Sequence, residues 1–163
     1  MERGQFSIEF IIVLAAFFIV LATVSVPLYT NTRETANELT DVTEAREAAN
    51  ELTLILNTVY SGSPGTQQTT TYWLPESASE VRGTSRDNKL QVSITLEFAD
   101  EDVTVEVSTL IPDEWKDRVF LENIELVENA RTYHRTTVAL EEDEESYLPR
   151  HQIAVSDKIL RRE

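Results

Sequence analysis

The feature that most constrains this chain is an uninterrupted apolar run near its start. Residues 10–29, FIIVLAAFFIVLATVSVPLY, contain no charged side chain. A helix of about 20 residues is long enough to cross a bilayer core of ~30 Å. The sequence therefore predicts one membrane-spanning helix. Pro27, near the end of the run, removes one helical hydrogen bond and is expected to kink this helix without ending it.

The residues before the run differ from an ordinary secretory signal, which combines a basic leader, a shorter apolar core and a later cleavage site. The leader here has one basic side chain, and a glutamate directly precedes a longer apolar run. We therefore expect the apolar segment to be retained. The sequence G-Q-x-S-x-E-F resembles the class III signal peptides of archaeal type IV pilin-like proteins, and is made by Gly4, Gln5, Ser7, Glu9 and Phe10.

This resemblance implies that a prepilin peptidase cuts between Gly4 and Gln5. Glu9 would then occupy the position at which type IV pilins carry their glutamate. A carboxylate drawn into a bilayer costs about 2.5–3.5 kcal/mol on insertion scales, so its natural partner is a cation at similar depth. The new α-amine of Gln5 could supply that cation, on the same chain or on a neighbour. The alternative is that Glu9 merely marks the membrane–water boundary.

Composition limits which kinds of partner the rest of the chain is expected to bind. The 163 residues leave room for one modest soluble domain after the span, and there is no cysteine to form a disulfide. The formal charge of −15 argues against binding of nucleic acid or anionic lipid by that domain. Eleven arginines against three lysines, with abundant threonine, resemble the proteins of halophilic archaea. An acidic extracellular domain without that origin is the equal alternative.

The pattern after the span predicts an α+β fold, with the membrane helix continuing into an amphipathic helix that packs on a small antiparallel sheet. Apolar residues recur at helical spacing up to Tyr60: Leu39, Val42, Ala45, Ala49, Leu52, Leu56 and Val59. A Ser-Gly-Ser-Pro-Gly break follows. The expected divisions are a leader at 1–4, the hydrophobic transmembrane helix at 5–29, the amphipathic helix at 30–62, a β head domain at 63–140 and an acidic linker and tail at 141–163.

Within the head, the clearest strand signal is the alternation of apolar and polar residues over 90–111, which predicts a hairpin turning at residues 99–102. We expect a linker or exposed edge at 66–71 and a short strand around Tyr72 and Trp73. An irregular connection is expected at 76–88, with a short strand around Val81 as the alternative. Two further strands are expected at 120–127 and 133–140, and a short helix or irregular tail after residue 146. Tyr72 and Trp73 are interpreted as core anchors, with an exposed contact surface as the alternative.

No constellation typical of catalysis stands out in the sequence, and no enzyme activity, metal or cofactor is expected. His134 and His151 lack a second ligand at metal-binding spacing and are interpreted as surface residues. The acidic run at 141–145 is interpreted as a solvated linker, because consecutive carboxylates lack the geometry of a calcium loop.

These features, with the resemblance, predict a structural subunit of an archaeal type IV pilus-like filament, a pilin or minor pilin. Its expected partners are other copies or other pilins, the prepilin peptidase, the membrane and the assembly machinery. Arg3 in the short leader favours a cytoplasmic N-terminus, although Arg33 opposes this. The head would then lie outside the cell, anchored by a single span and later part of a surface filament. The alternative is a membrane-anchored accessory or binding protein that never polymerises.

Overall fold

The computed structural model describes residues 8–127, 130–143 and 150–162. Its first element is one long helix, α1 (Ile8–Tyr60), which continues through Pro27. The predicted helix end is confirmed, because the Ser61–Gly65 break follows directly. The chain divides into two compact units, Met1–Leu39 and Thr40–Glu163, called unit 1 and unit 2 below.

Unit 1 consists, in its described part, of the N-terminal portion of α1. All side chains from Phe10 to Asn37 are exposed, although most of those up to Tyr29 are apolar. This helix is long and apolar enough to cross a membrane. Its few hydroxyls bond to carbonyls of the preceding turn: Thr23 donates to Ile19 at 2.7 Å and Thr32 to Leu28 at 2.7 Å. Such internal bonds lower the cost of placing a hydroxyl in lipid.

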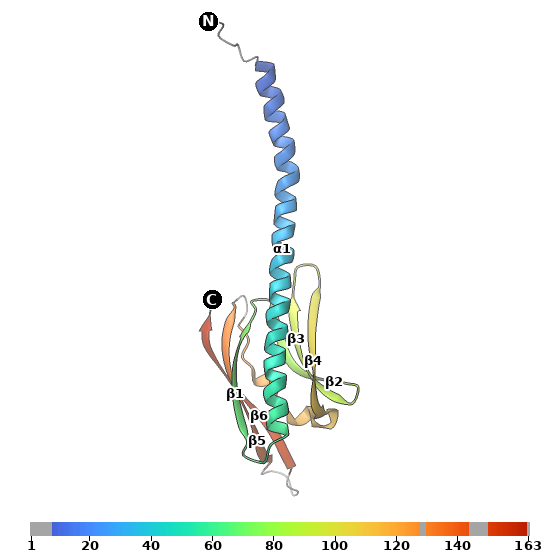
Figure 1. The fold of residues 1–163 in the computed structure, drawn as a ribbon, viewed down its shortest axis with the longest axis vertical. Coiled ribbons are helices and arrows are strands. Elements are labelled where there is room, and N and C mark those ends of the chain that lie inside the picture. The colour runs from blue at the N-terminus through green and yellow to red at the C-terminus, as the bar shows by residue number, and fades with distance from the viewer. Residues whose placement is uncertain (1–7, 128–129, 144–149, 163) are drawn as a thin grey trace. The chain divides into compact units, whose positions relative to one another are not determined.

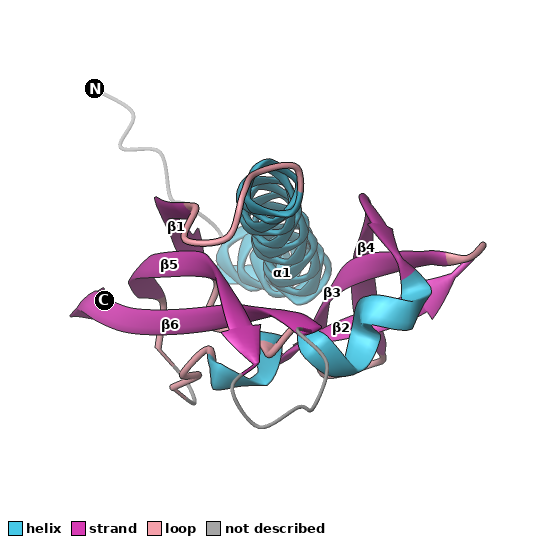
Figure 2. Ribbon diagram, turned by 90° about the horizontal axis from the view of Figure 1, so that it is seen from below, coloured by secondary structure: helices cyan, strands magenta, loops and turns pink. Residues whose placement is uncertain are grey.

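Unit 2 contains two three-stranded antiparallel sheets beside the C-terminal part of α1 (Figures 1 and 2). One sheet has the order β1-β5-β6, with β1 (Gln67–Leu74), β5 (Thr132–Asp143) and β6 (Arg150–Arg162). The other has the order β2-β3-β4, with β2 (Ala78–Arg86), β3 (Lys89–Glu97) and β4 (Asp102–Pro112). Two short 3-10 helices, η1 (Asp113–Arg118) and η2 (Leu121–Asn123), follow β4.

The core of unit 2 lies between α1 and the inner faces of both sheets. Seen along α1 in Figure 2, the two sheets lie on either side of the helix. The buried stripe of α1 begins at Ala45, with Val42 half-buried and Leu39 exposed. The main core side chains are Ala45, Ala48, Ala49, Leu52, Leu56 and Val59 from α1; Tyr72, Leu74, Val138, Leu140, Ile153 and Val155 from the first sheet; and Val81, Leu90, Val92, Ile94, Leu96, Val105 and Ile111 from the second.

Several predictions are confirmed at the level of elements. An antiparallel hairpin spans 89–112, as expected. Burial alternates along β4, whereas β3 is buried on both faces from Leu90 to Ile94. The strand around Tyr72 and the strand at 133–140 are both present, as parts of β1 and β5. The α+β class therefore holds, with two small sheets where one was expected.

Other predictions need correction. For 66–71 the exposed-edge alternative is confirmed and the linker is wrong, because residues 67–71 belong to β1, an edge strand paired with β5. The hydroxyls of Thr69 and Thr137 lie 2.8 Å apart on the outer face of this pair, where polar residues are accommodated. The stretch 76–88 is mostly β2, paired with β3, so the alternative of a strand around Val81 holds and that strand is longer than expected. No strand forms at 120–127, which contains η2 and irregular backbone. The described part of the tail, expected as a short helix or disordered segment, is β6, an edge strand on β5. Residues 141–143, expected to belong to a solvated linker, are the last residues of β5.

Candidate functional site

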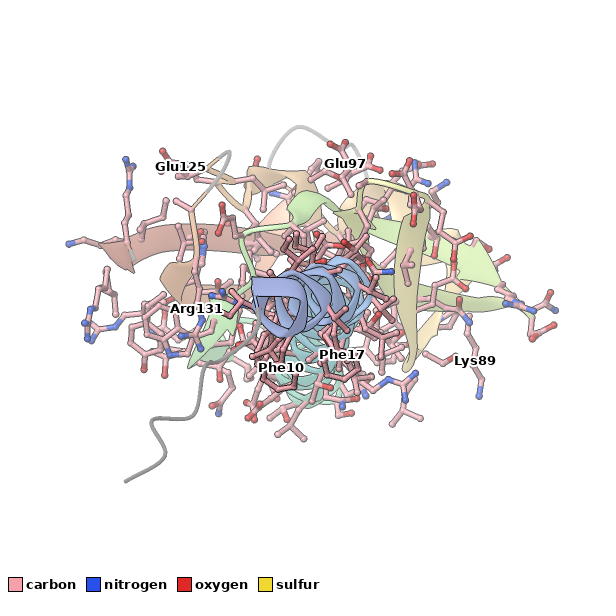
Figure 3. The ribbon with its side chains drawn as sticks, turned by 90° about the horizontal axis from the view of Figure 1, so that it is seen from above. Phe10, Phe17, Lys89, Glu97, Glu125 and Arg131 are labelled. Atoms are coloured by element: carbon pink, nitrogen blue, oxygen red, sulfur yellow. The ribbon has the colours of Figure 1, made fainter. Side chains whose placement is uncertain are left out.

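The apolar surface of α1 is the first candidate site. From Phe10 to Tyr29 the helix exposes large side chains on every side, with Phe10 55 % and Phe17 57 % exposed. These two rings stand seven residues apart and lie on the same side of the helix (Figure 3). An exposed apolar surface of this extent on a protein marks a place for lipid or for another apolar surface. The segment is therefore compatible with a membrane anchor.

The residues of the predicted signal motif are placed as follows. Gly4, Gln5 and Ser7 lie outside the described residues, so the cleavage site stays a prediction. Glu9 belongs to the first turn of α1, and its side chain lies outside the described part. Its pairing with the amine of Gln5 therefore also stays a prediction. Pro27 lies inside the helix, where the chain continues without a break, as expected.

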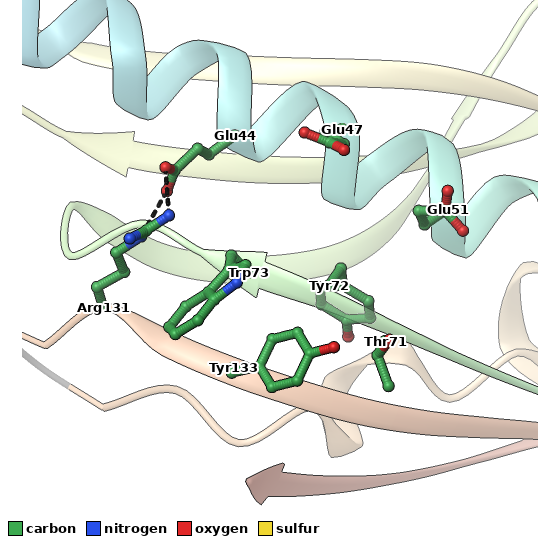
Figure 4. A pocket seen from close by; sticks show the side chains of 8 residues that line it. All are labelled: Glu44, Glu47, Glu51, Thr71, Tyr72, Trp73, Arg131 and Tyr133. Carbon is green, nitrogen blue, oxygen red and sulfur yellow. Dashed lines mark hydrogen bonds and ion pairs between the residues drawn. The ribbon is translucent and has the colours of Figure 1, made fainter. Parts of the chain in front are cut away.

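A second candidate is a groove in unit 2 between α1 and the C-terminal part of β1, with a volume of about 300 Å³. Figure 4 shows its lining, in which glutamates of α1 face aromatic side chains of the sheet. Nη2 and Nε of Arg131 donate to the two carboxylate oxygens of Glu44 at 2.7 and 3.0 Å. The lining residues are Glu44, Glu47, Glu51, Thr71, Tyr72, Trp73, Arg131 and Tyr133.

The aromatic side of this groove is held together by stacking. The guanidinium carbon of Arg131 lies 4.4 Å from the centre of the Trp73 ring, and the Trp73 and Tyr133 rings are 4.9 Å apart. A bidentate hydrogen bond to a carboxylate, combined with stacking on an aromatic ring, requires the planar guanidinium of arginine, which lysine lacks. On the helix side, Thr70 donates to Glu51 at 2.9 Å. The groove thus already holds a cation of the chain itself, and the described residues include no cluster suited to a metal ion.

A third candidate is a buried polar network on the inner face of the β1-β5-β6 sheet. Nδ1 of His134 lies 2.6 Å from Oδ2 of Asp157, and Nε2 lies 2.6 Å from the hydroxyl of Thr132. Thr136 donates to the other oxygen of Asp157 at 2.5 Å and pairs with the Tyr72 hydroxyl at 2.8 Å. The Tyr72 and His134 rings stack at 5.7 Å.

The order hydroxyl, imidazole and carboxylate in this network is that of a nucleophilic triad. However, the side chains of His134 and Asp157 are both completely buried, and Thr132 is 2 % exposed. A substrate could not reach the hydroxyl without opening the sheet. The network is therefore part of the core, where each polar group has the partner that burial demands.

The interpretation of His134 as a surface residue is thus wrong. The missed signal is the alternation of Thr132, His134, Thr136, Val138 and Leu140, which places the histidine on the same face of β5 as two core residues. Its partner Asp157 could not be found in this way, because it lies in the segment that was not expected to be a strand. Tyr72 is buried, as expected of a core anchor, whereas Trp73 is only half-buried on the other face.

The fold and these sites can be compared with known proteins. Comparison of the chain with protein-family models, with curated proteins and with solved structures finds no match.

Proposed function

We propose that this protein is a type IV pilin-like structural subunit, made as a membrane precursor, cut after Gly4 and assembled into a surface filament through the N-terminal part of α1. The observation that supports this most directly is the continuity of α1. One helix carries an apolar surface exposed on all sides up to Tyr29 and, further along, contributes the buried stripe of a compact head. A plain membrane anchor needs no such continuity between its span and the core of its domain.

The composition of the span supports contacts among many helices. Between Phe10 and Tyr29 there is no glycine, and bulky side chains such as Phe17 and Phe18 are spread around the helix. Close pairwise contact of membrane helices relies on small residues, so a bundle of several loosely contacting helices suits this surface better than a tight dimer. In this proposal lipid covers the surface before assembly, and the helices of other copies or other pilins cover it afterwards.

Glu9 sets the axial register of the filament in this proposal. Its carboxylate pairs with the α-amine that cleavage creates on Gln5 of a neighbouring copy. An unpaired charge in an apolar environment is costly, so docking at a register that pairs the two charges is favoured over other registers. The N-terminus faces the cytoplasm before assembly, and the acidic head lies outside.

The test is to determine the N-terminal residue of the protein in two fractions, the membrane and the material sheared from the cell surface. The proposal expects Gln5 at the N-terminus of protein in sheared filaments. A start at Met1 or Glu2 in both fractions would refute processing. Gln5 found in membranes alone would favour the other candidate function, a processed accessory protein that stays anchored.

A matched pair of variants tests the role of Glu9. Glu9→Ala is expected to be cut normally but to stay in the membrane fraction, because the neighbouring amine has lost its partner. Glu34→Ala removes a carboxylate from the same helix beyond the apolar run and is expected to assemble like the parent protein. Equal filament yields from the two variants would contradict the register role.

A further inference from the structure

Part of the outer face of the β1-β5-β6 sheet differs in charge from the rest of this acidic protein, although Glu141, opposite Gln152, lies elsewhere on the same face. Three neighbouring cross-strand rows make up this part: Trp73–Tyr133–Arg161, Thr71–Arg135–Lys158 and Thr69–Thr137–Ser156. None of these nine residues is acidic, although the whole chain has 29 acidic residues against 14 basic ones. We call these three rows the basic face. It lies on the side of the sheet away from the core, since the alternate residues His134 and Thr136 are buried.

The central row of the basic face contains two cations that form no ion pair with any described residue. Arg135 on β5 is directly opposite Lys158 on β6, and both side chains are exposed. Among the described residues, neither side chain has an ion pair. Like charges directly opposite each other on neighbouring strands are destabilising. An anionic partner placed over this row would remove that repulsion.

The same chain carries the complementary feature on its other sheet. The turn between β3 and β4, residues 97–102, contains four exposed carboxylates: Glu97, Asp100, Glu101 and Asp102. Glu97 and Asp102 are directly opposite each other, which is again a pair of like charges. We call this segment the acidic turn. Within the part of the chain that the structure describes, none of the four carboxylates forms an ion pair.

The acidic turn lies at the end of unit 2 at which its portion of α1 begins (Figure 1). The hydroxyl of Ser77 donates to Asp41, in the first turn of that portion, at 2.7 Å. The backbone N–H of Glu97 donates to the carbonyl of Ser77 at 2.8 Å. Arg131, beside the basic face, is bonded to Glu44, one turn further along α1. The Trp73 row of the basic face is therefore the one nearest in height to the acidic turn. The central row lies further along α1, since Thr70, next to Thr71, donates to Glu51. The two features are on sheets on opposite sides of α1 (Figure 2).

We propose that the basic face of one copy of this chain binds the acidic turn of a second copy. Because the two sheets flank α1, the basic face and the acidic turn of a single copy are on opposite sides of the helix and do not bind each other. The contact uses two different surfaces, so each copy keeps one of each for a further neighbour, and such contacts generate a ring or an open filament. Trp73 and Tyr133, in the adjacent row, supply aromatic surface of the kind that anchors protein interfaces. This inference rests on the proposed function, for which it names a contact between heads.

The absence of cysteine makes the contact accessible to cross-linking. Two copies of the full chain are expressed together, one with Lys158→Cys and one with Glu101→Cys, and are treated with a short thiol cross-linker. Membranes and sheared filaments are analysed separately. The proposal expects a mixed dimer in amounts roughly tenfold above a control pair that combines Glu101→Cys with Lys116→Cys, an exposed lysine of η1. A yield no higher than that of the control, in both fractions, would overturn it.

The filament yield of charge-reversal variants provides a second test. Arg135→Glu with Lys158→Glu is expected to reduce filament yield by roughly tenfold or more, since it sets like charges against the next copy's acidic turn. Adding Asp100→Lys and Glu101→Lys to the same chain should restore assembly. The matched control reverses Lys89 and Lys116 instead, with the same change in net charge. Equal yields from the two reversals would overturn the inference.

Binding of the protein to a column of anionic polysaccharide tests the other occupant. If Arg135→Glu with Lys158→Glu assembles normally but is no longer retained on the column, the basic face binds a glycan, and the inference is overturned.

The two proposals fail in different ways. Filaments of the parent protein without the 158–101 cross-link would overturn the head contact and leave the filament function standing. The cross-link in membranes of cells that never produce filaments would support the contact between copies and overturn the filament function.

Discussion

At the scale of single residues, Tyr72 shows how burial changes the chemistry of the core. Burial raises the pKa of its phenol well above the usual value of about 10, and the nearby carboxylate of Asp157 raises it further. The hydrogen bond with Thr136 acts in the opposite direction but is the smaller effect. The folded state therefore holds the phenol proton more tightly than the unfolded state does.

This difference predicts a loss of stability at high pH. The contribution of Tyr72 is fully present below about pH 10, the pKa in the unfolded chain, and decreases as the pH rises from there towards the raised pKa of the folded state. Tyr72→Phe should cost about 1 kcal/mol at pH 8, because Thr136 loses a partner, and this deficit should shrink above pH 10. Denaturant unfolding from pH 8 to 11.5, followed by tryptophan fluorescence, tests this. A constant deficit across the range would contradict it.

Removal of two different buried hydroxyls in the β2-β3-β4 sheet should change the free energy of unfolding in different ways. Thr109 donates to the carbonyl of Leu90 at 2.8 Å and accepts from the N–H of Ile111 at 3.1 Å, so Thr109→Val should destabilise unit 2 by about 1–3 kcal/mol. The hydroxyl of Ser93 is buried with no partner among the described residues. Ser93→Ala should be neutral or stabilising by up to about 1 kcal/mol. Free energies of unfolding for both variants would test the pair, and a large loss in Ser93→Ala would contradict it.

At the scale of elements, the β2–β3 turn explains why residues 76–88 form a hairpin arm. Arg86 pairs with Lys89, leaving Asp87 and Asn88 as a two-residue turn with φ values of 53° and 59°. Two positive φ values in succession are typical of the turn whose twist matches paired strands, and Asp and Asn tolerate them better than most residues. This Asp-Asn pair is a local signal that the interpretation of 76–88 as irregular overlooked.

Substitution at Asn88 tests the turn. Asn88→Val should lower the free energy of unfolding by about 1–2 kcal/mol, because a β-branched side chain is strained at positive φ. Asn88→Gly should stay close to the parent protein, since glycine adopts this conformation readily. Thermal unfolding of the two variants, side by side, provides the comparison. Equal losses would show that the amide side chain, and not the backbone conformation, matters at this position.

At the scale of the whole molecule, the two units differ in what covers their apolar residues. Among the described residues, the buried apolar core of unit 2 begins at Ala45. Unit 1 exposes its apolar side chains, so its solubility depends on lipid, detergent or other helices. The head should therefore keep its fold without the span, because none of its buried core residues would be lost.

Two truncations test this division. Deletion of residues 1–30 should give a water-soluble protein with the strand content of the head and cooperative unfolding. Deletion of residues 1–50 removes Ala45, Ala48 and Ala49 from the core and should give an unfolded or aggregated chain, because the loss of several buried side chains exceeds the stability of a small domain. Circular dichroism and sedimentation distinguish the outcomes. Aggregation of the shorter deletion would contradict the independence of the head.

The sequence by itself determined the features that depend on local pattern. An uncharged run of membrane-spanning length, helical spacing up to Tyr60 and the alternation over 90–111 each lie within a continuous stretch, so α1 and the β3–β4 hairpin could be predicted. Side-chain periodicity follows from backbone geometry, which acts over a few residues. The motif around Glu9 can likewise be identified from the sequence, although its role stays a prediction.

Only the tertiary structure decided which of the remaining segments became strands. The polar residues 67–71 and the charged residues 150–162 lack a strong strand pattern of their own, and both are ordered by backbone hydrogen bonds to β5. The bonds between β1 and β5 join residues far apart in the chain, which no local pattern records, whereas β6 pairs with the strand that directly precedes it. His134 is buried because Asp157 of β6 and Tyr72 of β1 pack against it. The basic face is formed by the same pairing of β1, β5 and β6. The physical reason is that backbone pairing between distant strands can outweigh weak local preference.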